Sequence, residues 1–375
     1  MIPFNRPFYP PTTLKFIQDS LATNHISGDG KYSHKIKQFF DQKFGLRYNL
    51  MTTSCTDALE LIALTIDLKK EDEVILPSYT FVSTANPFLL RGAKLIFADS
   101  CNDSPNIDLD HVRQLITKKT KAIVIVHYAG IPCDIEKLIK IKKDFSTIYI
   151  VEDAAQCVDS FYKGTPLGSF GDFSAFSFHE TKNISCGEGG LFVSKEKSNY
   201  HKAEIIREKG TNRMSFIRGE VNKYGWKTIG SSFLPSDILA AILWAQLQEM
   251  GEIKSNRKKI WNNYYEGLEC LESSGKIIRP KFSPQADHNA HIFYLITRSE
   301  TERNQLIQFL AERSIKASFH YLSLHKSNFF KSKTGNDSLP NSDKYTSCLV
   351  RLPMFNQMNI RKSNKVIENI QAFFK

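Results

Sequence analysis

The sequence lacks any apolar run approaching the roughly 18 residues that a membrane-spanning helix needs. Its first ten residues, MIPFNRPFYP, lack the basic, apolar, small-residue order of a secretion signal. Long polar tracts, low-complexity segments and internal repeats are also missing. Hydrophobic residues make up 41% of the 375 positions and charged residues 24%, which is close to globular averages. We therefore expect a folded cytoplasmic protein without a membrane partner.

The cysteines lack a pattern. There are seven, an odd number, and no C-x-x-C pair occurs among them. A disulfide framework and a zinc ribbon are therefore not expected, and we predict no metal site. The seven are Cys55, Cys101, Cys133, Cys157, Cys186, Cys270 and Cys348.

A basic stripe is missing as well, although the chain as a whole is basic. Fifty Lys and Arg residues against 39 Asp and Glu residues give a net charge of +11. That excess favours anionic partners such as nucleic acid, acidic lipid or phosphorylated small molecules. Because the charges are spread out, and no helix-turn-helix or zinc-finger spacing occurs, we expect no nucleic-acid partner.

What is present is an alternation of short apolar runs with stretches of helical spacing. Between the first two runs, Leu59, Ile62, Ala63 and Ile66 fall on one helix face. Apolar strands joined by helical crossovers are typical of a mostly parallel sheet buried on both faces. We therefore predict an α/β protein with a three-layer α/β/α large domain. The predicted strands are residues 48–52, 73–77, 94–99, 121–127 and 147–152.

The second half of the chain predicts two further strands and then a smaller domain. FSAFSF and GLFV bracket a polar turn that contains glycine, and a helix is expected over residues 195–207. Residues 210–226 show no clear period, which predicts a long loop that walls a site. A helical pattern from Pro235 connects to an α+β domain with strands at 291–297 and 315–322 and helices near 301–312 and 361–374. We expect domains over 1–245 and 246–375.

Ligands of open α/β sheets bind beyond the carboxyl ends of the strands, so the residues there are the first candidates. After the first strand, TTSCTDAL leads into a helix whose free N–H groups attract anions. A plain helix N-cap explains the same letters. After the second strand, PSYTFVSTAN places Phe81 where its ring could stack on a planar ligand, or else pack in the core.

Two later strand ends add a carboxylate and an amine. IVEDAAQ runs an apolar strand into Glu152, Asp153 and Gln156, and a carboxylate at that depth is costly unless a cationic or protonated group meets it. FSFHETKN followed by GEGG places Lys182 in a polar turn, where a solvated lysine is the simplest interpretation. Together, the anion cradle, ring, carboxylate and amine match a phosphorylated heteroaromatic cofactor that forms a Schiff base.

These segments, with HYLSLH, resemble the DegT/DnrJ/StrS sugar-nucleotide aminotransferases over nearly the whole chain. The resemblance implies pyridoxal 5′-phosphate and the aspartate aminotransferase-like fold (fold type I). The resemblance also implies a role for each matching residue. Lys182 would form the Schiff base with the cofactor, Asp153 would face the cofactor's ring nitrogen, and Gln156 would contact its 3-oxygen. Phe81 would stack on the cofactor ring, and Ser177 with the Cys55 and Thr56 backbone would hold its phosphate.

The resemblance also implies a homodimer or higher homo-oligomer, because a neighbouring subunit completes the phosphate site in this family. Many relatives carry Gly-x-Asn in that loop, whereas this chain has Gly230, Ser231 and Ser232. We expect the Ser232 hydroxyl to replace the asparagine.

Within the family, ISGDG, HYAG, SFHETKN, IREKGTNR and TIGSSF are most similar to members that aminate C4 of dTDP-4-keto-6-deoxy-D-glucose with L-glutamate. The expected products are dTDP-4-amino-4,6-dideoxy-D-galactose, which supplies enterobacterial surface polysaccharide, and 2-oxoglutarate. Arg213 is the candidate for the diphosphate, because Arg forks match phosphate oxygens. His320, Tyr321 and His325 are expected to border the sugar.

Three alternatives remain. The substrate could be another keto sugar nucleotide, with a gluco product, a 3-keto sugar or a UDP group. Related dehydratases use the aminated cofactor, but they place His where Lys182 stands here. A nucleic-acid-binding protein could also have borrowed the fold, since fold alone does not fix function, but the two catalytic-type domains leave no room for an added DNA-binding module.

Overall fold

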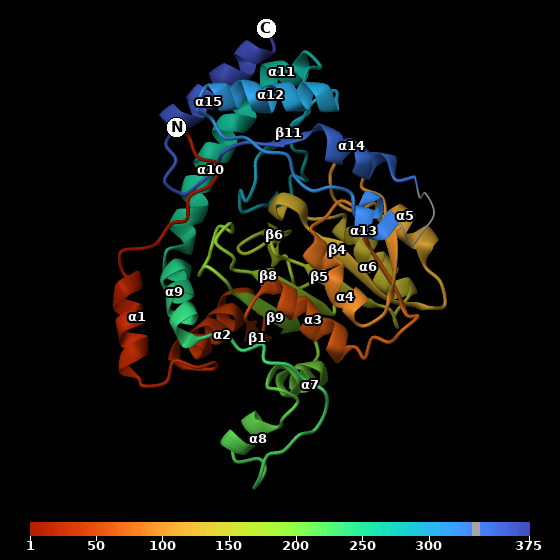
Figure 1. Ribbon diagram of the computed structural model, residues 1–375, viewed down its shortest axis with the longest axis vertical. Helices are drawn as coiled ribbons and strands as arrows, with labels where there is room; N and C mark the ends of the chain where they lie inside the picture. The colour runs from red at the N-terminus through yellow and green to blue at the C-terminus, as the bar shows by residue number, and fades with distance from the viewer. Residues whose placement is uncertain (332–337) are drawn as a thin grey trace.

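The computed structural model describes residues 1–331 and 338–375, and its centre is a seven-stranded sheet (Figure 1). The strand order is β1-β9-β8-β5-β4-β2-β3. Only β9 runs antiparallel to its neighbours in this sheet, so the other six strands end at one edge. The strands are β1 (Tyr48–Thr52), β2 (Glu73–Pro77), β3 (Lys94–Ala98), β4 (Thr120–Val126), β5 (Tyr149–Asp153), β8 (Phe173–Ser177) and β9 (Gly190–Ser194).

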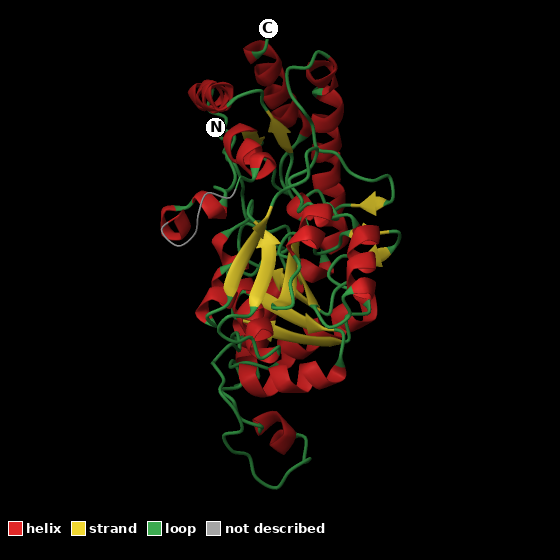
Figure 2. Cartoon of the chain, turned by 90° about the vertical axis from the view of Figure 1, so that its right-hand side faces the viewer, coloured by secondary structure: helices red, strands yellow, loops and turns green. Residues whose placement is uncertain are grey.

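Helices cover both faces of this sheet, which confirms the predicted three layers (Figure 2). Because neighbouring strand residues point to opposite faces, Val74 packs in one apolar cluster and Ile75 in another. The predicted face of α3 (Cys55–Thr65) lies in the first cluster, with Leu59 and Ile62 buried. The other covering helices are α1 (Thr13–Ala22), α2 (Lys31–Phe44), α4 (Asn86–Leu90), α5 (Leu109–Leu115), α6 (Ile135–Asp144), α7 (Lys197–Arg207) and α9 (Asp237–Gln248).

The C-terminal part has its own apolar cluster and lies beyond the edge where the six strands end (Figure 1). The strand expected at 291–297 is shorter, and β11 (Tyr294–Ile296) pairs antiparallel with β12 (Leu349–Arg351). Ile2 packs in this cluster too, so the chain begins beside its C-terminal part. The helices are α10 (Met250–Gly267), α11 (Glu269–Ser273), α12 (Glu300–Glu312), α13 (Asn328–Lys331), α14 (Pro340–Cys348) and α15 (Ile360–Phe373). The predicted domain boundary between residues 245 and 246 stays a prediction.

The structure differs from the predicted elements in three further places. Residues 315–322 form no strand: only isolated bridges join Ile315 to Ile2 and Ser318 to Arg351, and the positive φ of 36° at Tyr321 ends any extended run. Residues 210–226 contain a short helix, α8 (Arg213–Ile217), in a segment that projects away from the C-terminal part (Figure 1). A small unpredicted sheet joins β6 (Phe161–Tyr162), β7 (Thr165–Pro166) and β10 (Ala286–Asp287).

Short 3-10 turns complete the described chain: η1 (Val82–Thr84), η2 (Tyr128–Gly130) and η3 (Leu324–Lys326). Across residues 1–331 and 338–375, none of the helices has both the length and the apolar character that a bilayer span requires.

Candidate active site

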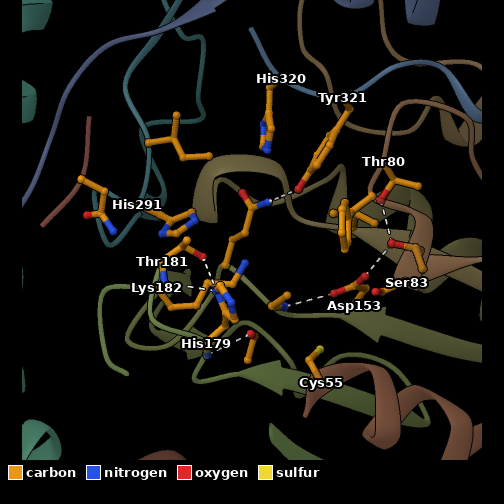
Figure 3. A pocket seen from close by; sticks show the side chains of 18 of the residues that line it. Cys55, Thr80, Ser83, Asp153, His179, Thr181, Lys182, His291, His320 and Tyr321 are labelled. Carbon is orange, nitrogen blue, oxygen red and sulfur yellow. Dashed lines mark hydrogen bonds between the residues drawn. The ribbon is translucent and has the colours of Figure 1, made fainter. Parts of the chain in front are cut away.

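A cavity of about 580 Å³ opens where the parallel strands end, between the sheet and the C-terminal part. Its lining comes from segments far apart in the sequence, including Phe4 near the start of the chain and Arg351 in the C-terminal part. Figure 3 shows the side chains of Lys182 and Asp153 around the same space. Nine of the residues predicted for the site line this cavity: Cys55, Thr56, Phe81, Asp153, Gln156, Ser177, Lys182, His320 and Tyr321.

Lys182 lies in the turn between β8 and β9 and is half-buried. Burial lowers the pKa of its amine, and this effect outweighs the opposing attraction of the nearby Asp153 carboxylate. A lowered pKa increases the neutral fraction of the amine, which is the nucleophilic form. The next residue anchors the turn: Asn183 donates from Nδ2 to the carbonyl of Asn289 at 2.9 Å, and its Oδ1 lies 3.0 Å from Nδ1 of His291.

Asp153 ends β5 with its carboxylate buried at the cavity. It accepts hydrogen bonds from Thr84 Oγ1 at 2.8 Å and from the backbone N–H of Ala155 at 3.2 Å. Thr80 Oγ1 lies 2.7 Å from Thr84 Oγ1 and extends this polar chain. Burial raises the pKa of Asp153, and in the described part of the chain no ion pair balances its charge. The carboxylate is therefore suited to a protonated ligand atom.

The neighbouring carboxylate, Glu152, points to the opposite face of the strand and is satisfied inside the protein. It lies 2.9 Å from Nε2 of His127 and accepts the N–H groups of Gly168 at 2.8 Å and Gly171 at 2.6 Å. Alternation along a strand separates the two side chains. Of the two acidic residues that the sequence places here, only Asp153 reaches the cavity.

The N-terminus of α3 forms a polar cradle on another wall. Ser54 caps the helix by accepting the N–H of Asp57 at 3.0 Å, and Thr56 donates its hydroxyl to Ser83 at 2.9 Å. Ser177, at the end of β8, adds a fourth hydroxyl. Hydroxyls around a helix N-terminus suit a phosphate. Cys55 supplies backbone here: burial raises the pKa of its thiol well above the usual value, so it stays neutral.

A glycine allows the sheet to approach this cradle closely. Gly190 begins β9 directly beneath the turn that leads into α3. A Cβ atom at this position would overlap the backbone of Ser54 and Cys55. The close packing therefore fixes where the first free N–H groups of α3 point.

Gln156 and a group of aromatic rings form the opposite wall. Gln156 accepts the N–H of Ala129 at 2.6 Å and donates to the Tyr321 hydroxyl at 3.2 Å. His320 stacks on Tyr321 with ring centroids 3.5 Å apart, and its Nδ1 lies 2.7 Å from the Tyr128 hydroxyl. Burial lowers the pKa of His320 well below its usual value, so the ring is neutral.

Phe81 stands beside these rings, its ring centroid 6.1 Å from that of Tyr321. Its side chain remains 55% exposed, which is unusual for a large apolar residue and leaves the ring open to the cavity. A planar ligand could cover it. The ring is therefore not part of the core, the alternative that the sequence left open.

Three residues predicted for the site do not line the cavity of this chain. Arg213 begins α8 and lies 3.4 Å from the carboxylate of Glu208. Ser232 is exposed and is joined to Glu208 by an isolated backbone bridge. His325 is buried, with its Nδ1 2.6 Å from the hydroxyl of Ser78. The substrate roles of these residues stay predictions.

The cavity residues that the sequence reasoning did not name include Phe4, Arg257, His291 and Arg351. Each lies far from a predicted strand end, and only the tertiary fold brings it to the cavity. His291 left a weak signal, since it begins the strand predicted at 291–297. For residues 1–331 and 338–375, no cluster of three or more His, Cys, Asp or Glu side chains suits a metal ion.

Solved structures with the same arrangement show the fold class. Aminotransferase TlmJ from Streptoalloteichus hindustanus matches all of this chain and 99% of its own, with a TM-score of 0.91 at 23% identity. PseC from Helicobacter pylori, an aminotransferase involved in pseudoaminic acid biosynthesis, matches 100% of this chain and 99% of its own, with a TM-score of 0.89 at 23% identity. The predicted aspartate aminotransferase-like fold is thereby confirmed.

The family follows from sequence. The model of the DegT/DnrJ/EryC1/StrS aminotransferase family matches residues 11–371. The protein MJ1066 of Methanocaldococcus jannaschii, itself uncharacterized, is 30% identical over 382 aligned positions, which cover 100% of this chain and 97% of that one. Spr1654 from Streptococcus pneumoniae, a candidate sugar aminotransferase, is 26% identical and matches with a TM-score of 0.91 over 100% of this chain and 99% of its own. The chain belongs to the DegT/DnrJ/EryC1/StrS aminotransferase family, and it is an aminotransferase.

Proposed function

We propose that this protein transfers an amino group from L-glutamate to a keto sugar nucleotide with pyridoxal 5′-phosphate as cofactor. One observation carries the proposal: a lysine of lowered pKa and a buried, unbalanced carboxylate share a cavity with the N-terminus of a helix. Solved structures of Spr1654, 26% identical to this chain, include a PLP form and a PMP form, which supports the cofactor.

The residues fit this cofactor group by group. The α3 N-terminus with Thr56, Ser83 and Ser177 would hold its phosphate, and Asp153 would face its ring nitrogen. Phe81 would cover one face of the ring, and Gln156 would lie by the 3-oxygen. When bound, the cofactor supplies an electron-withdrawing ring that stabilises negative charge on the carbon bearing the transferred nitrogen.

Lys182 performs the proton transfers of this reaction. In the donor half its amine, whose neutral fraction increases because burial lowers its pKa, would take the proton from Cα and pass it to the cofactor carbon that receives the nitrogen. In the acceptor half it would pass a proton to the sugar carbon that receives the new amine. Asp153 would hold the ring nitrogen protonated, because its buried carboxylate has no ion-pair partner among the described residues. His320 and Tyr321, which stack on one another at the same cavity, would limit the access of water to the amine.

For the substrate, the sequence motifs favour the specific activity of a dTDP-4-amino-4,6-dideoxygalactose transaminase. The excess of 50 Lys and Arg over 39 Asp and Glu suits a nucleotide diphosphate. In a homodimer, Arg213 of the projecting segment and the exposed Ser232 would reach the neighbouring cavity, while His320, Tyr321 and His325 would border the sugar. The product would enter surface polysaccharide synthesis in the cytoplasm. The alternative is another keto sugar nucleotide.

Two experiments test these proposals in order. Adding pyridoxal phosphate to purified protein should produce a yellow chromophore that borohydride fixes at position 182, and a colourless protein would refute the function. Product NMR after reaction of dTDP-4-keto-6-deoxyglucose with glutamate should then show an axial C4 amine. An equatorial amine, or turnover only with a 3-keto or UDP-linked sugar, would support the alternative.

A further inference from the structure

A braced segment of the C-terminal part carries His291 to the active-site cavity. Arg257 donates from Nε to the carbonyl of Ala290 at 3.0 Å and from Nη2 to the carbonyl of His291 at 2.7 Å. The indole N–H of Trp261 donates to the carbonyl of Ile292 at 3.1 Å. Because side chains of α10 hold three successive carbonyls, the backbone that carries the His291 ring is fixed before any ligand arrives.

The contacts of the His291 ring determine its tautomer. Asn183 donates from Nδ2 to the carbonyl of Asn289 at 2.9 Å, and a carbonyl can only accept, so this contact fixes the orientation of the Asn183 amide. Its Oδ1 lies on the side of His291, 3.0 Å from Nδ1. Since an amide oxygen also only accepts, Nδ1 of His291 carries the hydrogen. In the neutral ring the other nitrogen, Nε2, then has a free lone pair.

The ring is neutral, and this lone pair is on the cavity side. Burial lowers the pKa of His291 well below its usual value, and the charges of three cations lower it further: Lys182, Arg257 and Arg351. Among residues 1–331 and 338–375, the His291 side chain makes no hydrogen bond besides the one to Asn183. His291 lines the cavity and Asn183 does not, so Nε2 is the nitrogen that a group in the cavity can reach.

Lys182 supplies the matching donor. Its amine makes no hydrogen bond or ion pair in the described ranges, and its charge acts on His291 across the same cavity (Figure 3). Asn183, which orients the imidazole, directly follows Lys182 in the chain, so one turn of backbone positions both groups. A lysine side chain has four rotatable bonds, and a hydrogen bond to a fixed acceptor restricts them.

We propose that Nε2 of His291 accepts a hydrogen bond from the amine of Lys182 whenever that amine is free of the cofactor, and so holds it where the proton transfers take place. This inference rests on the proposed aminotransferase function and makes His291 a positioning residue. A protonated imidazole could not serve, because it has no lone pair and would repel the charged form of the amine.

The first test measures the amine without cofactor or turnover. Trace acetic anhydride labels the full-length apoprotein across pH, and mass spectrometry follows the peptide that contains Lys182. Because a neutral acceptor favours the charged amine, His291→Leu should lower the pKa of Lys182 further and raise its labelling rate at neutral pH roughly 3- to 10-fold. His291→Gln keeps an oxygen that can accept, and should recover part of the wild-type curve.

Turnover of the holoenzyme gives the second measurement. His291→Leu should reduce kcat roughly 10- to 100-fold, the scale of a misplaced reacting group, while both KM values change by less than about threefold. His291→Gln should regain part of this loss. His288→Leu is the matched control: His288 is buried in the same segment, 4.4 Å from the ring of Trp261, but does not line the cavity. It should leave Lys182 labelling and kcat unchanged.

Nitrogen-15 NMR of wild-type apoprotein labelled at histidine reports the tautomer directly, so a variant that folds poorly does not decide the matter. His291 should have a protonated Nδ1 and an unprotonated Nε2 at neutral pH. A protonated Nε2 would remove the acceptor and overturn the inference.

Each other result also overturns the inference. Equal effects of His288→Leu and His291→Leu would make His291 a structural residue. A higher KM for the keto sugar nucleotide with unchanged kcat would assign the lone pair to a sugar hydroxyl, and an unchanged labelling curve would remove the contact with Lys182. If wild-type protein forms no chromophore with pyridoxal phosphate, the proposed function fails instead. The labelling and NMR results do not depend on the chromophore, so the two failures are distinguishable.

Discussion

The hydroxyl of Thr84 donates a 2.8 Å hydrogen bond to the carboxylate of Asp153. This contact joins the loop after β2 to the end of β5, so two strand ends of the sheet hold one functional group. The carboxylate is buried, and the hydrogen bond stabilises its ionised form without neutralising it. The site therefore keeps the negative charge that the proposed cofactor needs.

Asp153→Asn should fold, bind the cofactor weakly and lose roughly 100-fold or more in turnover, the scale of a deleted electrostatic partner. Because burial raises the pKa of Asp153, cofactor affinity of the wild-type apoprotein should fall as the pH decreases through that raised pKa. The variant should show no such decrease. Titration with pyridoxal phosphate across pH measures both, and an identical acidic decrease in the variant would contradict the assignment.

Lys182→Ala should abolish the chromophore and reduce turnover by at least roughly 100- to 10,000-fold, the usual contribution of a positioned acid–base group. Since burial lowers the pKa of Lys182, the rate at which wild-type apoprotein forms the chromophore should rise with pH and level off below the ordinary lysine range. Stopped-flow absorbance measures this profile. Lys195→Ala, which changes another lysine of the same region, is the control, and it should match wild type.

Gly190→Ala should move the start of α3, because a Cβ atom there overlaps the backbone of Ser54. We expect a stability loss of about 1–3 kcal/mol, typical of overpacking, and weaker cofactor binding. Gly251→Ala in α10 is the matched control: open space surrounds that position, and alanine favours a helix interior by about 1 kcal/mol. Urea unfolding measures the stability of both variants, and titration with pyridoxal phosphate measures their cofactor affinity. If both variants gave the same results, the proposed phosphate cradle at the start of α3 would be contradicted.

Glu152→Gln should reduce stability by about 1–3 kcal/mol, because it weakens charge-assisted bonds to His127 and to the Gly168 and Gly171 N–H groups. The folded Glu152→Gln variant should still form the chromophore with pyridoxal phosphate, since Glu152 does not reach the cavity. Thermal unfolding and absorbance measure these two properties. Glu136→Gln, an exposed carboxylate, should leave both unchanged. Loss of the chromophore in folded Glu152→Gln would contradict the division of roles along β5.

Much of the sheet could be predicted because its strands are short apolar runs buried on both faces. The range 73–77 was predicted as the structure has it, and Asp153 and Lys182 followed from the rule that ligands bind at strand ends. The motif resemblance then supplied the roles. Sequence periodicity did not show which of Glu152 and Asp153 reaches the cavity. The structure shows it, because side chains alternate between the two faces of β5.

What could not be predicted depends on contacts between distant segments. Arg351 and Phe4 are more than 300 positions apart, and no local pattern relates them. Residues 315–322 looked like a strand because they alternate apolar and polar letters, but Tyr321 adopts a left-handed conformation that turns its ring toward Gln156. At these residues, contacts around the cavity outweigh the local preference for a strand.

The antiparallel direction of β9 has a consequence for how this protein could change. Since β8 and β9 are paired neighbours, the residues between Ser177 and Gly190 leave and re-enter the sheet at the same edge. Insertions or deletions in this connection would lie outside the paired strands and would not shift the register of any strand. Evolution, or a protein engineer, could therefore remodel the surroundings of Lys182 while the sheet beneath it stays intact.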